Sequence, residues 1–337
     1  MVTSLTAVEY QEALIDAEVS SYRQATFAVN TKKTYLSQLR VYVRFCLYFH
    51  YKIVPCSTKT LVRYVIFLAR NHVPSSVTQY LNVIRLIHLE NGYENPLKEN
   101  YVLNSVTKGI ARVKGVPPKR KLPITPELLI AFYHMLDMSV VENLVFYCAC
   151  VVAFFSFFRK STLLSKDLES HVPASNLCRK DVKFLADGAL LSVRHTKTIQ
   201  FHERELQVPL TRSDTILCPR RFLHLMFHMC PNVPEEAPLF SFQQNGKLKC
   251  LTHSNFVSKL KDLVTRVGLN AADFSGHSFR RAGATYAWQN GMSAQLIMAQ
   301  GDWKSDSWMR YVNISMQDRV LAANKLADSV KKLVRSH

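Results

Sequence analysis

The chain has 337 residues, of which 48% are hydrophobic, and this is enough for two compact domains. It carries 43 basic and 25 acidic side chains, a formal net charge of +18 that favours a polyanionic partner without separating DNA from RNA. The eight cysteines form no C-x-x-C pair, which excludes a typical structural zinc site, so we expect reduced thiols and no metal.

The first 114 residues are predicted to form an all-helical domain. Apolar residues recur at intervals of three and four in TKKTYLSQLRVYVRFCLYFH and TKTLVRYVIFLARN. Asn30-Thr31 and Ser57-Thr58 are the expected helix caps. The pattern predicts four or five helices. Periodicity alone leaves a helical bundle without a nucleic-acid contact as an alternative.

A basic segment that contains prolines, residues 115–123, separates this domain from the rest of the chain. Its prolines stiffen the backbone, and Lys119, Arg120 and Lys121 attract phosphate. We therefore expect these three side chains to contact the phosphates of a nucleic acid, DNA or RNA, along the linker. A short basic run is also typical of a nuclear localisation signal, and the two interpretations are compatible.

After the linker, helices are predicted over residues 124–136 and 140–158. The second is mostly apolar from Leu144 to Phe158, which is shorter than the roughly 20 residues needed to span a bilayer. A buried core helix is the better interpretation. It runs directly into Arg159, whose guanidinium is always charged and matches phosphate in geometry. Taken alone, Arg159 would be a surface residue that interacts with a helix C-terminus.

A small β-region is predicted from about residue 182 to residue 210, with helices again from Arg220 onward. Within it, residues 189–195 and 201–210 flank the polar segment Thr196-Lys197-Thr198, which indicates a hairpin with Lys197 near its tip. An ammonium there can enter a DNA groove and protonate a leaving oxygen. Taken alone, a lysine on a turn is a solvated side chain. Arg194 and Lys183 are weaker candidates for the same task.

The segment from His277 to Tyr311 combines several groups that can handle phosphate. His277 and Arg280 are three residues apart and share one face of a helix, so two phosphate ligands can converge from one element. The indole N–H of Trp303 can donate to the same phosphate, and the oxygen of Tyr311 can attack phosphorus. Arg281 is adjacent to Arg280 and faces either a carboxylate or the backbone of a nucleic acid such as DNA.

The order H-x-x-R, then Gly-Asp-Trp, then Tyr resembles the C-terminal signature of the tyrosine recombinases, the phage-integrase superfamily. This resemblance implies an arginine at the end of a buried helix and a lysine in a β-hairpin, which Arg159 and Lys197 supply. It implies a core-binding domain over 1–114 and a catalytic domain over 124–337. The expected fold is mainly α with two domains, the second being α+β with a small antiparallel sheet.

The resemblance also implies a site-specific recombinase or integrase that cleaves and rejoins DNA without metal, ATP or another cofactor. Tyr311 would form a 3′-phosphotyrosyl intermediate, Arg159 and Arg280 would neutralise the phosphate, and Lys197 would protonate the 5′ oxygen. The implied catalytic set is Arg159, Lys197, His277, Arg280, Trp303 and Tyr311.

One position departs from the family pattern. The family usually has a carboxylate three residues after its first arginine, and here that residue is Thr162. A threonine can accept a hydrogen bond from Arg159 or His277 but supplies no charge, so support from another group such as Asp167 would be needed. Two alternatives follow, a domesticated DNA-binding protein with weakened or lost cleavage and a type IB topoisomerase-like enzyme.

Beyond Tyr311, residues 314–334 are predicted to form an amphipathic helix. By resemblance, this helix docks into a neighbouring protomer and supports a tetramer on paired sites in double-stranded DNA. Packing on its own domain is the alternative. The apolar stripe comprises Val320, Leu321, Leu326, Val330 and Leu333.

The segments FRKSTLL and GDWKSDSWMRYV resemble sequences of the eukaryotic mobile-element branch of the family, the DIRS-like or Crypton-like elements. A protein of that branch would act in the nucleus, and one from another host would be cytoplasmic. Base-edge contacts depend on groove positions, so the sequence predicts no target site.

Overall fold

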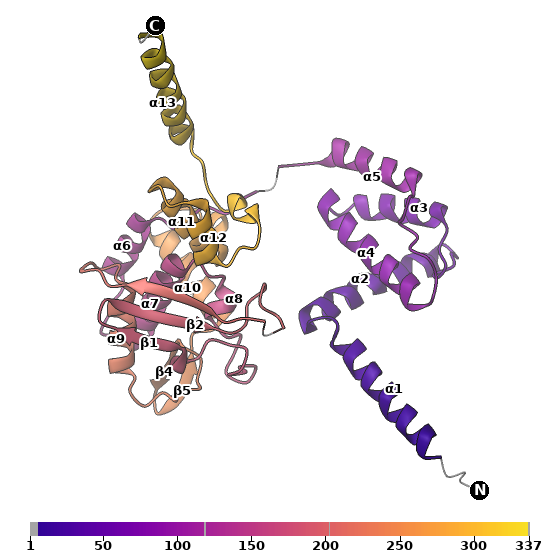
Figure 1. Cartoon of the computed structure of the whole chain (residues 1–337), viewed down its shortest axis with the longest axis horizontal. Helices are drawn as coiled ribbons and strands as arrows, with labels where there is room; N and C mark the ends of the chain where they lie inside the picture. Colours follow the sequence, from indigo (N-terminus) through magenta and orange to yellow (C-terminus); the bar gives the residue numbers. More distant parts are fainter. Residues whose placement is uncertain (1–5, 118, 202, 336–337) are drawn as a thin grey trace. The chain divides into compact units, whose positions relative to one another are not determined.

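The computed structural model describes residues 6–117, 119–201 and 203–335 (Figure 1). The chain divides into two compact units, Met1–Pro118 and Lys119–His337. Both are built largely from helices, and the second also contains small antiparallel sheets, so the expected fold class is confirmed. No helix in these described ranges is both long enough and apolar enough to cross a membrane.

Unit 1 contains five helices within its described residues. Four of them build one core around Tyr42, Leu61, Tyr64 and Ile84, each at most 1% exposed. Burying each such side chain contributes about 1.5–3 kcal/mol, so this small core supports an independent bundle. The helices are α1 (Ala7–Ala25), α2 (Val29–Tyr48), α3 (Thr58–Ala69), α4 (Pro74–Glu90) and α5 (Tyr101–Lys114).

The two expected caps have different outcomes. The Ser57 hydroxyl accepts a hydrogen bond from the Thr60 N–H at 3.1 Å, and the cap of α3 is therefore confirmed. The cap expected at Asn30-Thr31 is wrong, because α2 already begins at Val29 and its first residues include that pair.

Unit 2 is organised around the central helix α7. The remaining bounds are α6 (Pro126–Met135), α7 (Val141–Ser156), α8 (Lys160–Leu163), η1 (Arg179–Asp181), β1 (Val182–Leu185), β2 (Gly188–Val193), β3 (Leu206–Thr211), α9 (Pro219–Met229), β4 (Ser241–Gln244), β5 (Lys247–Cys250), α10 (His253–Arg266), η2 (Ala271–Asp273), α11 (His277–Gln289), α12 (Ala294–Gly301), η3 (Asp306–Arg310) and α13 (Met316–Arg335).

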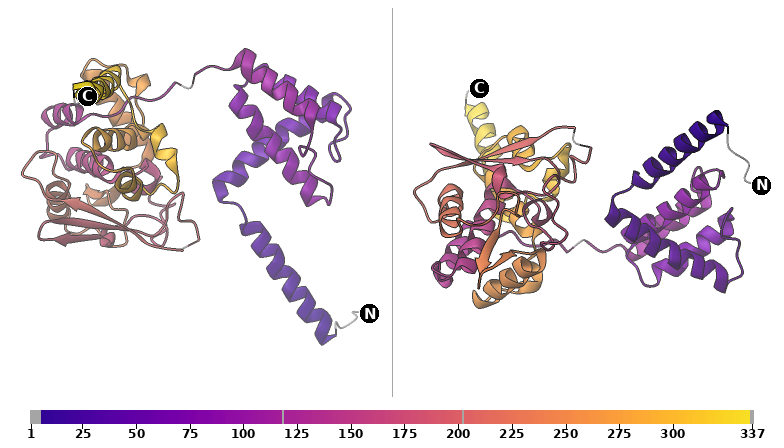
Figure 2. Two further views of the ribbon diagram at one scale, coloured as in Figure 1. Left: turned by 45° about the horizontal axis from the view of Figure 1, so that its top comes forward. Right: turned by 90° about the horizontal axis from the view of Figure 1, so that it is seen from below.

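Helix α7 is apolar on every side, so it is stable only when other elements surround it. It packs against α9, α11, α6 and strand β3, and nearly all of its side chains are buried. Figures 1 and 2 show the β1–β3 sheet and the helices gathered around it. Phe157 ends the helix in a left-handed conformation, and Arg159 follows two residues later. The core position of this segment was therefore predictable from its composition.

The β-region predicted around residues 182–210 is present as an antiparallel sheet of order β1-β2-β3. The hairpin partners are confirmed, with Gly188 opposite Thr211 and Val193 opposite Leu206. The strands are shorter than predicted, so residues 194–201 and 203–205 lie outside them, in a long loop. A second antiparallel pair, β4 with β5, corrects the expectation that only helices follow Arg220.

Candidate active site

A close approach between α11 and the end of α7 forms the base of the site. A Cβ added at Gly283 would lie 2.1 Å from Phe157 Cδ1 and 2.3 Å from the Phe154 carbonyl oxygen. Only a glycine therefore lets the two helices meet at this distance. The Arg280 Nη1 donates to the Phe157 carbonyl at 2.6 Å, one turn earlier on α11. This contact fixes Arg280 beside the segment that carries Arg159.

The Arg280 side chain is a buried cation with unused donors. It is 1% exposed, and its Nε and Nη2 have no hydrogen-bond partner among the described residues. Burial, and next the positive charge of Arg159, lower its pKa. An uncompensated charge in such a place is costly, and an anion that accepts the two free N–H donors would remove the cost. The geometry therefore defines an anion site.

Trp303 forms one wall of this anion site. Its ring centre lies 3.7 Å from the Arg280 Cζ, and its buried indole Nε1 has no partner within the described chain. A Cβ at Gly301 would lie 1.7 Å from the Trp303 Cζ3, so the glycine is needed for the ring to fold back against α12. The indole therefore adds a further unused N–H donor beside the two of the guanidinium.

Tyr311 is placed against the same two side chains. Its ring centre lies 5.2 Å from the Arg280 Cζ and 5.4 Å from the centre of the Trp303 ring. Helix α11 also holds the surrounding backbone, because Arg281 Nη1 donates to the Arg310 carbonyl at 2.9 Å. Thr285 Oγ1 donates to the Tyr311 carbonyl at 3.3 Å. The half-buried phenol is therefore anchored at the anion site.

His277 lies at the first position of α11, and its side chain is partly exposed. Desolvation lowers its pKa, and the charges of Arg159, Arg280 and Lys197 lower it further, as does Lys160. The imidazole is therefore neutral at pH 7. These same effects place Arg159 and Lys197 within electrostatic range of the histidine. The six residues chosen from the sequence are thus brought to one region by contacts or by mutual charge effects.

Lys197 lies in the long loop between β2 and β3, with its side chain exposed. Its neighbours Thr196 and Thr198 both donate their hydroxyls to the Asp302 carboxylate, the first at 2.7 Å. Arg204, near the other end of the loop, forms an ion pair with the same carboxylate. Sequence reasoning missed Asp302. The available signal was a carboxylate inside the Gly-Asp-Trp motif.

Thr162 stands at the position where the family usually has a carboxylate, and the sequence suggests Asp167 as a carboxylate that could support it. The backbone N–H of Thr162 bonds to the Arg159 carbonyl at 2.9 Å, in the first turn after that arginine. The Ser170 side chain lowers the pKa of the Asp167 carboxyl most, and the Ser170 N–H, which donates to the carboxylate at 2.6 Å, lowers it further. By contrast, the negative charge of Asp302 partly opposes the lowering of the Arg280 pKa that burial and Arg159 cause. Asp302 is therefore a carboxylate that interacts electrostatically with Arg280.

The basic residues predicted to contact DNA lie close to the start of α11. Lys119 forms an ion pair with Asp273 at 3.1 Å, and Lys121 donates to the Ala272 carbonyl. Burial lowers the pKa of Arg281, and the nearby positive charge of Arg120 lowers it further. Arg281 itself is buried. Contact of these four side chains with DNA stays a prediction.

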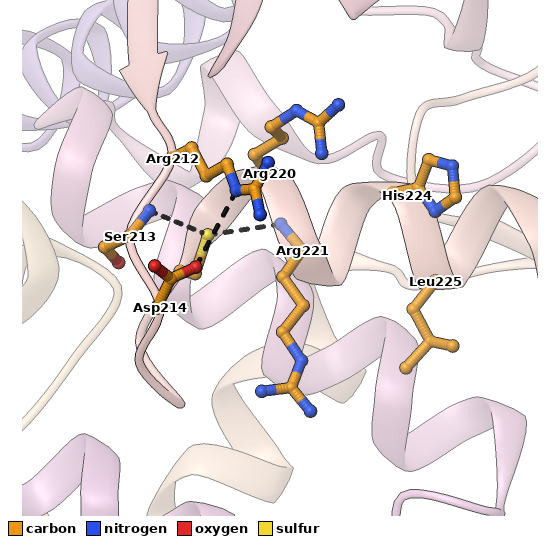
Figure 3. Close-up of a pocket in the computed structure, with 8 residues that line it drawn as sticks. Arg212, Ser213, Asp214, Arg220, Arg221, His224 and Leu225 are labelled. Atoms are coloured by element: carbon orange, nitrogen blue, oxygen red, sulfur yellow. Dashed lines mark hydrogen bonds and ion pairs between the residues drawn. The ribbon is translucent and has the colours of Figure 1, made fainter. Parts of the chain in front are cut away.

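A cavity of about 450 Å³ lies elsewhere in unit 2, at the start of α9 (Figure 3). Arg212, Arg220 and Arg221 contribute to its wall, and the Cys218 Sγ accepts the Ser213 N–H at 3.2 Å. Its lining includes none of the six predicted catalytic residues. No cluster of metal-ligating side chains occurs among the residues that the structure describes.

A scan against models of known families finds no match. An integrase/recombinase xerD homolog of Selenomonas ruminantium is 26% identical over 295 residues, covering 85% of this chain and 82% of that protein.

Two solved structures share the fold at 14% identity. The Tn1549 transposon integrase (residues 82–397) has a TM-score of 0.58 and covers 91% of this chain and 97% of its own. Lambda integrase (residues 75–356) has a TM-score of 0.56, with coverage of 91% and 95%. At this identity, the two structures show that the chain shares their fold. The chain is thus similar in sequence to one integrase/recombinase and similar in fold to two integrases.

Proposed function

We propose that this protein is a site-specific DNA recombinase or integrase that breaks and rejoins DNA through a 3′-phosphotyrosyl intermediate. The observation that carries this proposal is the buried Arg280, whose two unused N–H donors lie with the Trp303 indole beside Tyr311. A phosphodiester is an anion with two non-bridging oxygens, which suits this donor set.

Each predicted residue has one role in the proposed reaction. The Tyr311 oxygen attacks phosphorus, so a P–O bond to tyrosine forms while the P–O5′ bond breaks. Arg159 and Arg280 neutralise the non-bridging oxygens as charge develops. Lys197 gives a proton to the departing 5′ oxygen, which leaves as a hydroxyl. A 5′-hydroxyl from a partner strand then reverses the step and reseals the backbone.

His277 and Trp303 position the phosphate in this proposal. The indole N–H can only donate, so it suits a phosphate oxygen and not a proton acceptor role. The neutral His277 can donate from one ring nitrogen and accept with the other. No metal and no ATP are required, because the energy of the broken phosphodiester is kept in the phosphotyrosyl bond.

Double-stranded DNA as the partner is supported by relatives and by charge. The Tn1549 integrase structure contains circular intermediate DNA, and the lambda integrase dimer is bound to a core site. Another lambda integrase structure, with a TM-score of 0.57 and 14% identity, is a tetramer bound to a Holliday junction. The net charge of +18 supplies long-range attraction to such a polyanion. We infer a tetramer on paired sites.

The terminal helix α13 is the proposed contact between protomers. Val320, Leu321 and Val330 are each more than half exposed, so they offer apolar surface to a partner. For Leu326 and Leu333 the structure describes the helical backbone and not the side chains. We further propose a nuclear location if the gene comes from a eukaryotic DIRS-like or Crypton-like element, and a cytoplasmic one otherwise.

A nicked suicide duplex tests the proposal. Cleavage near the nick releases a short fragment, so religation is lost and a covalent protein–DNA complex accumulates. The complex is expected with the wild-type protein and absent with Tyr311→Phe. Tyr286→Phe is the matched control, because Tyr286 lies on α11 and is 46% exposed. DNA binding without any covalent complex would favour the binding-only alternative that Thr162 raises.

Relaxation of a supercoiled plasmid distinguishes a recombinase from the remaining alternative, a type IB topoisomerase-like enzyme. A type IB topoisomerase-like enzyme relaxes supercoils without exchanging strands between sites. The recombinase proposal predicts joined products from two duplexes and a tetrameric complex by mass photometry. Relaxation as a monomer without joined products would contradict it.

A further inference from the structure

The buried carboxylate of Asp302 is surrounded by donors from one loop. Its side chain is 4% exposed. Thr196 and Thr198 donate hydroxyls to its Oδ2, and the Arg204 guanidinium pairs with its Oδ1. All three donors belong to the segment between β2 and β3. Asp302 itself lies between Gly301 and Trp303, far away in the sequence.

These bonds hold the backbone around Lys197 while its side chain stays free. The Thr196 Oγ1 also accepts the backbone N–H groups of Thr198 at 3.0 Å and Ile199 at 3.1 Å. The Thr196 N–H in turn bonds to the Ile199 carbonyl at 3.0 Å. Lys197 is thus the exposed residue at the top of a small closed turn. The Asp302 carboxylate forms the base of that turn.

The charge of Asp302 is maintained in the folded chain. Burial alone would raise its pKa, but the hydrogen bonds from Thr198, Thr196 and Arg204 together lower it. A carboxylate accepts all of these donors at once, whereas an amide at this position would turn its NH₂ toward some of them. The hydrogen bonds from Thr196, Thr198 and Arg204 therefore depend on the ionised carboxylate of Asp302.

We propose that Asp302 is a positioning residue that holds the Lys197 loop against the Trp303 segment. Through this link the proton donor and the anion site form one rigid arrangement, so that Lys197 reaches the 5′ oxygen of the phosphate held by Arg280. The inference depends on the proposed DNA cleavage and names a determinant of its proton transfer step.

A sulfur-substituted substrate tests this link. In a suicide duplex whose scissile 5′-bridging oxygen is replaced by sulfur, attack by Tyr311 breaks a P–S bond and releases a thiolate. A thiol ionises at a pKa of about 8.5, so this leaving group needs no donated proton. Loss of the Lys197 amine should therefore matter on the oxygen substrate and not on the sulfur substrate.

The proposal predicts that Asp302→Asn follows the pattern of Lys197→Ala. On the oxygen substrate, Lys197→Ala should lose about 10²- to 10⁴-fold in single-turnover cleavage rate. Asp302→Asn should lose about 10- to 100-fold, because the donor is displaced and not removed. On the sulfur substrate both should cleave within a few fold of wild type. Asp306→Asn, an exposed acid three residues after Trp303, should match wild type on both.

Thr198→Val keeps the ion pair between Arg204 and Asp302 and deletes one hydroxyl, so it repeats the test if Asp302→Asn does not fold. It should show a smaller loss on oxygen and the same rescue by sulfur. Wild-type cleavage of the oxygen substrate by Asp302→Asn would overturn the proposal. So would an equal loss on both substrates while Lys197→Ala is rescued. Absence of any adduct in the wild-type protein would instead contradict the proposed function.

Discussion

Arg280 and Trp303 are in cation–π contact, with the guanidinium carbon 3.7 Å from the centre of the indole ring. Both side chains are buried, and each has an N–H without a hydrogen-bond partner in the described chain. The contact partly offsets the cost of burying the cation, by about 2 kcal/mol or more for a desolvated pair. It leaves the donors free for a ligand, which is the arrangement that an anion-binding catalytic site needs.

Replacing Trp303 by phenylalanine separates its two contributions. Phenylalanine retains an aromatic face for Arg280 but removes the indole N–H. We expect a small change in melting temperature and a loss of about 100- to 1000-fold in cleavage rate, the range for removing one donor to a reacting anion. Single-turnover adduct formation measures the rate and calorimetry measures the stability. A rate equal to that of wild type would show that the indole N–H does not contact the phosphate.

Gly283 is predicted to be the most sensitive glycine of the site. An alanine there would clash with Phe157 and with the Phe154 carbonyl oxygen, so α7 and α11 would have to separate. We expect Gly283→Ala to destabilise the protein by about 1–3 kcal/mol, as overpacking does, and to abolish cleavage. Gly109→Ala is the matched control, because nothing lies within 4 Å of a Cβ there. That change in α5 should be neutral or stabilising, by up to about 1 kcal/mol.

His277 should titrate below free histidine, because burial and the neighbouring cations lower its pKa. The folded chain then binds this proton less well than the unfolded chain. Its contribution to the free energy of unfolding therefore declines as the pH falls below about 6.5, the unfolded value. The difference in stability between wild type and His277→Gln, measured from pH 7.5 to pH 5, should show this slope. A duplex should raise the pKa in an NMR titration, because phosphate opposes the cations.

Arg120 is the linker residue for which we predict the clearest DNA contact. Lys119 and Lys121 already bond to the Asp273 and Ala272 region of unit 2, whereas Arg120 lies near another cation, Arg281. Arg120→Ala should lower affinity for duplex DNA and reduce the slope of log affinity against log salt by about 0.9, one phosphate contact. Arg120→Lys, which retains the charge, should keep the slope. An unchanged slope in Arg120→Ala would contradict the contact.

Much of the fold could be predicted from local patterns. The apolar run before Arg159 allowed only a buried helix, and the spacing of His277 and Arg280 placed both on one helix. The β2–β3 hairpin was visible from β-type residues around Lys197, but its loop was predicted too short. The reason is tertiary, because Thr196 and Thr198 bond to Asp302 and not to a strand partner.

The missed features share a dependence on distant residues. The short β4–β5 pair follows no strong alternation, and its pairing is decided by packing against α7. Asp302 carries no special local signal beyond its motif, since its donors come from a loop about a hundred residues earlier. The same holds for Gly283, whose role depends on the end of α7. Such contacts become visible only once the helices are placed.

The most direct test of the central claim is to identify the residue that carries DNA. Wild-type protein would be trapped on a nicked duplex, digested with nuclease and protease, and examined by mass spectrometry for a peptide with an attached nucleotide. The account predicts a 3′-nucleotide on the Tyr311 phenol and none on Tyr286. A nucleotide on any other residue, or a trapped complex that persists in Tyr311→Phe, would contradict it.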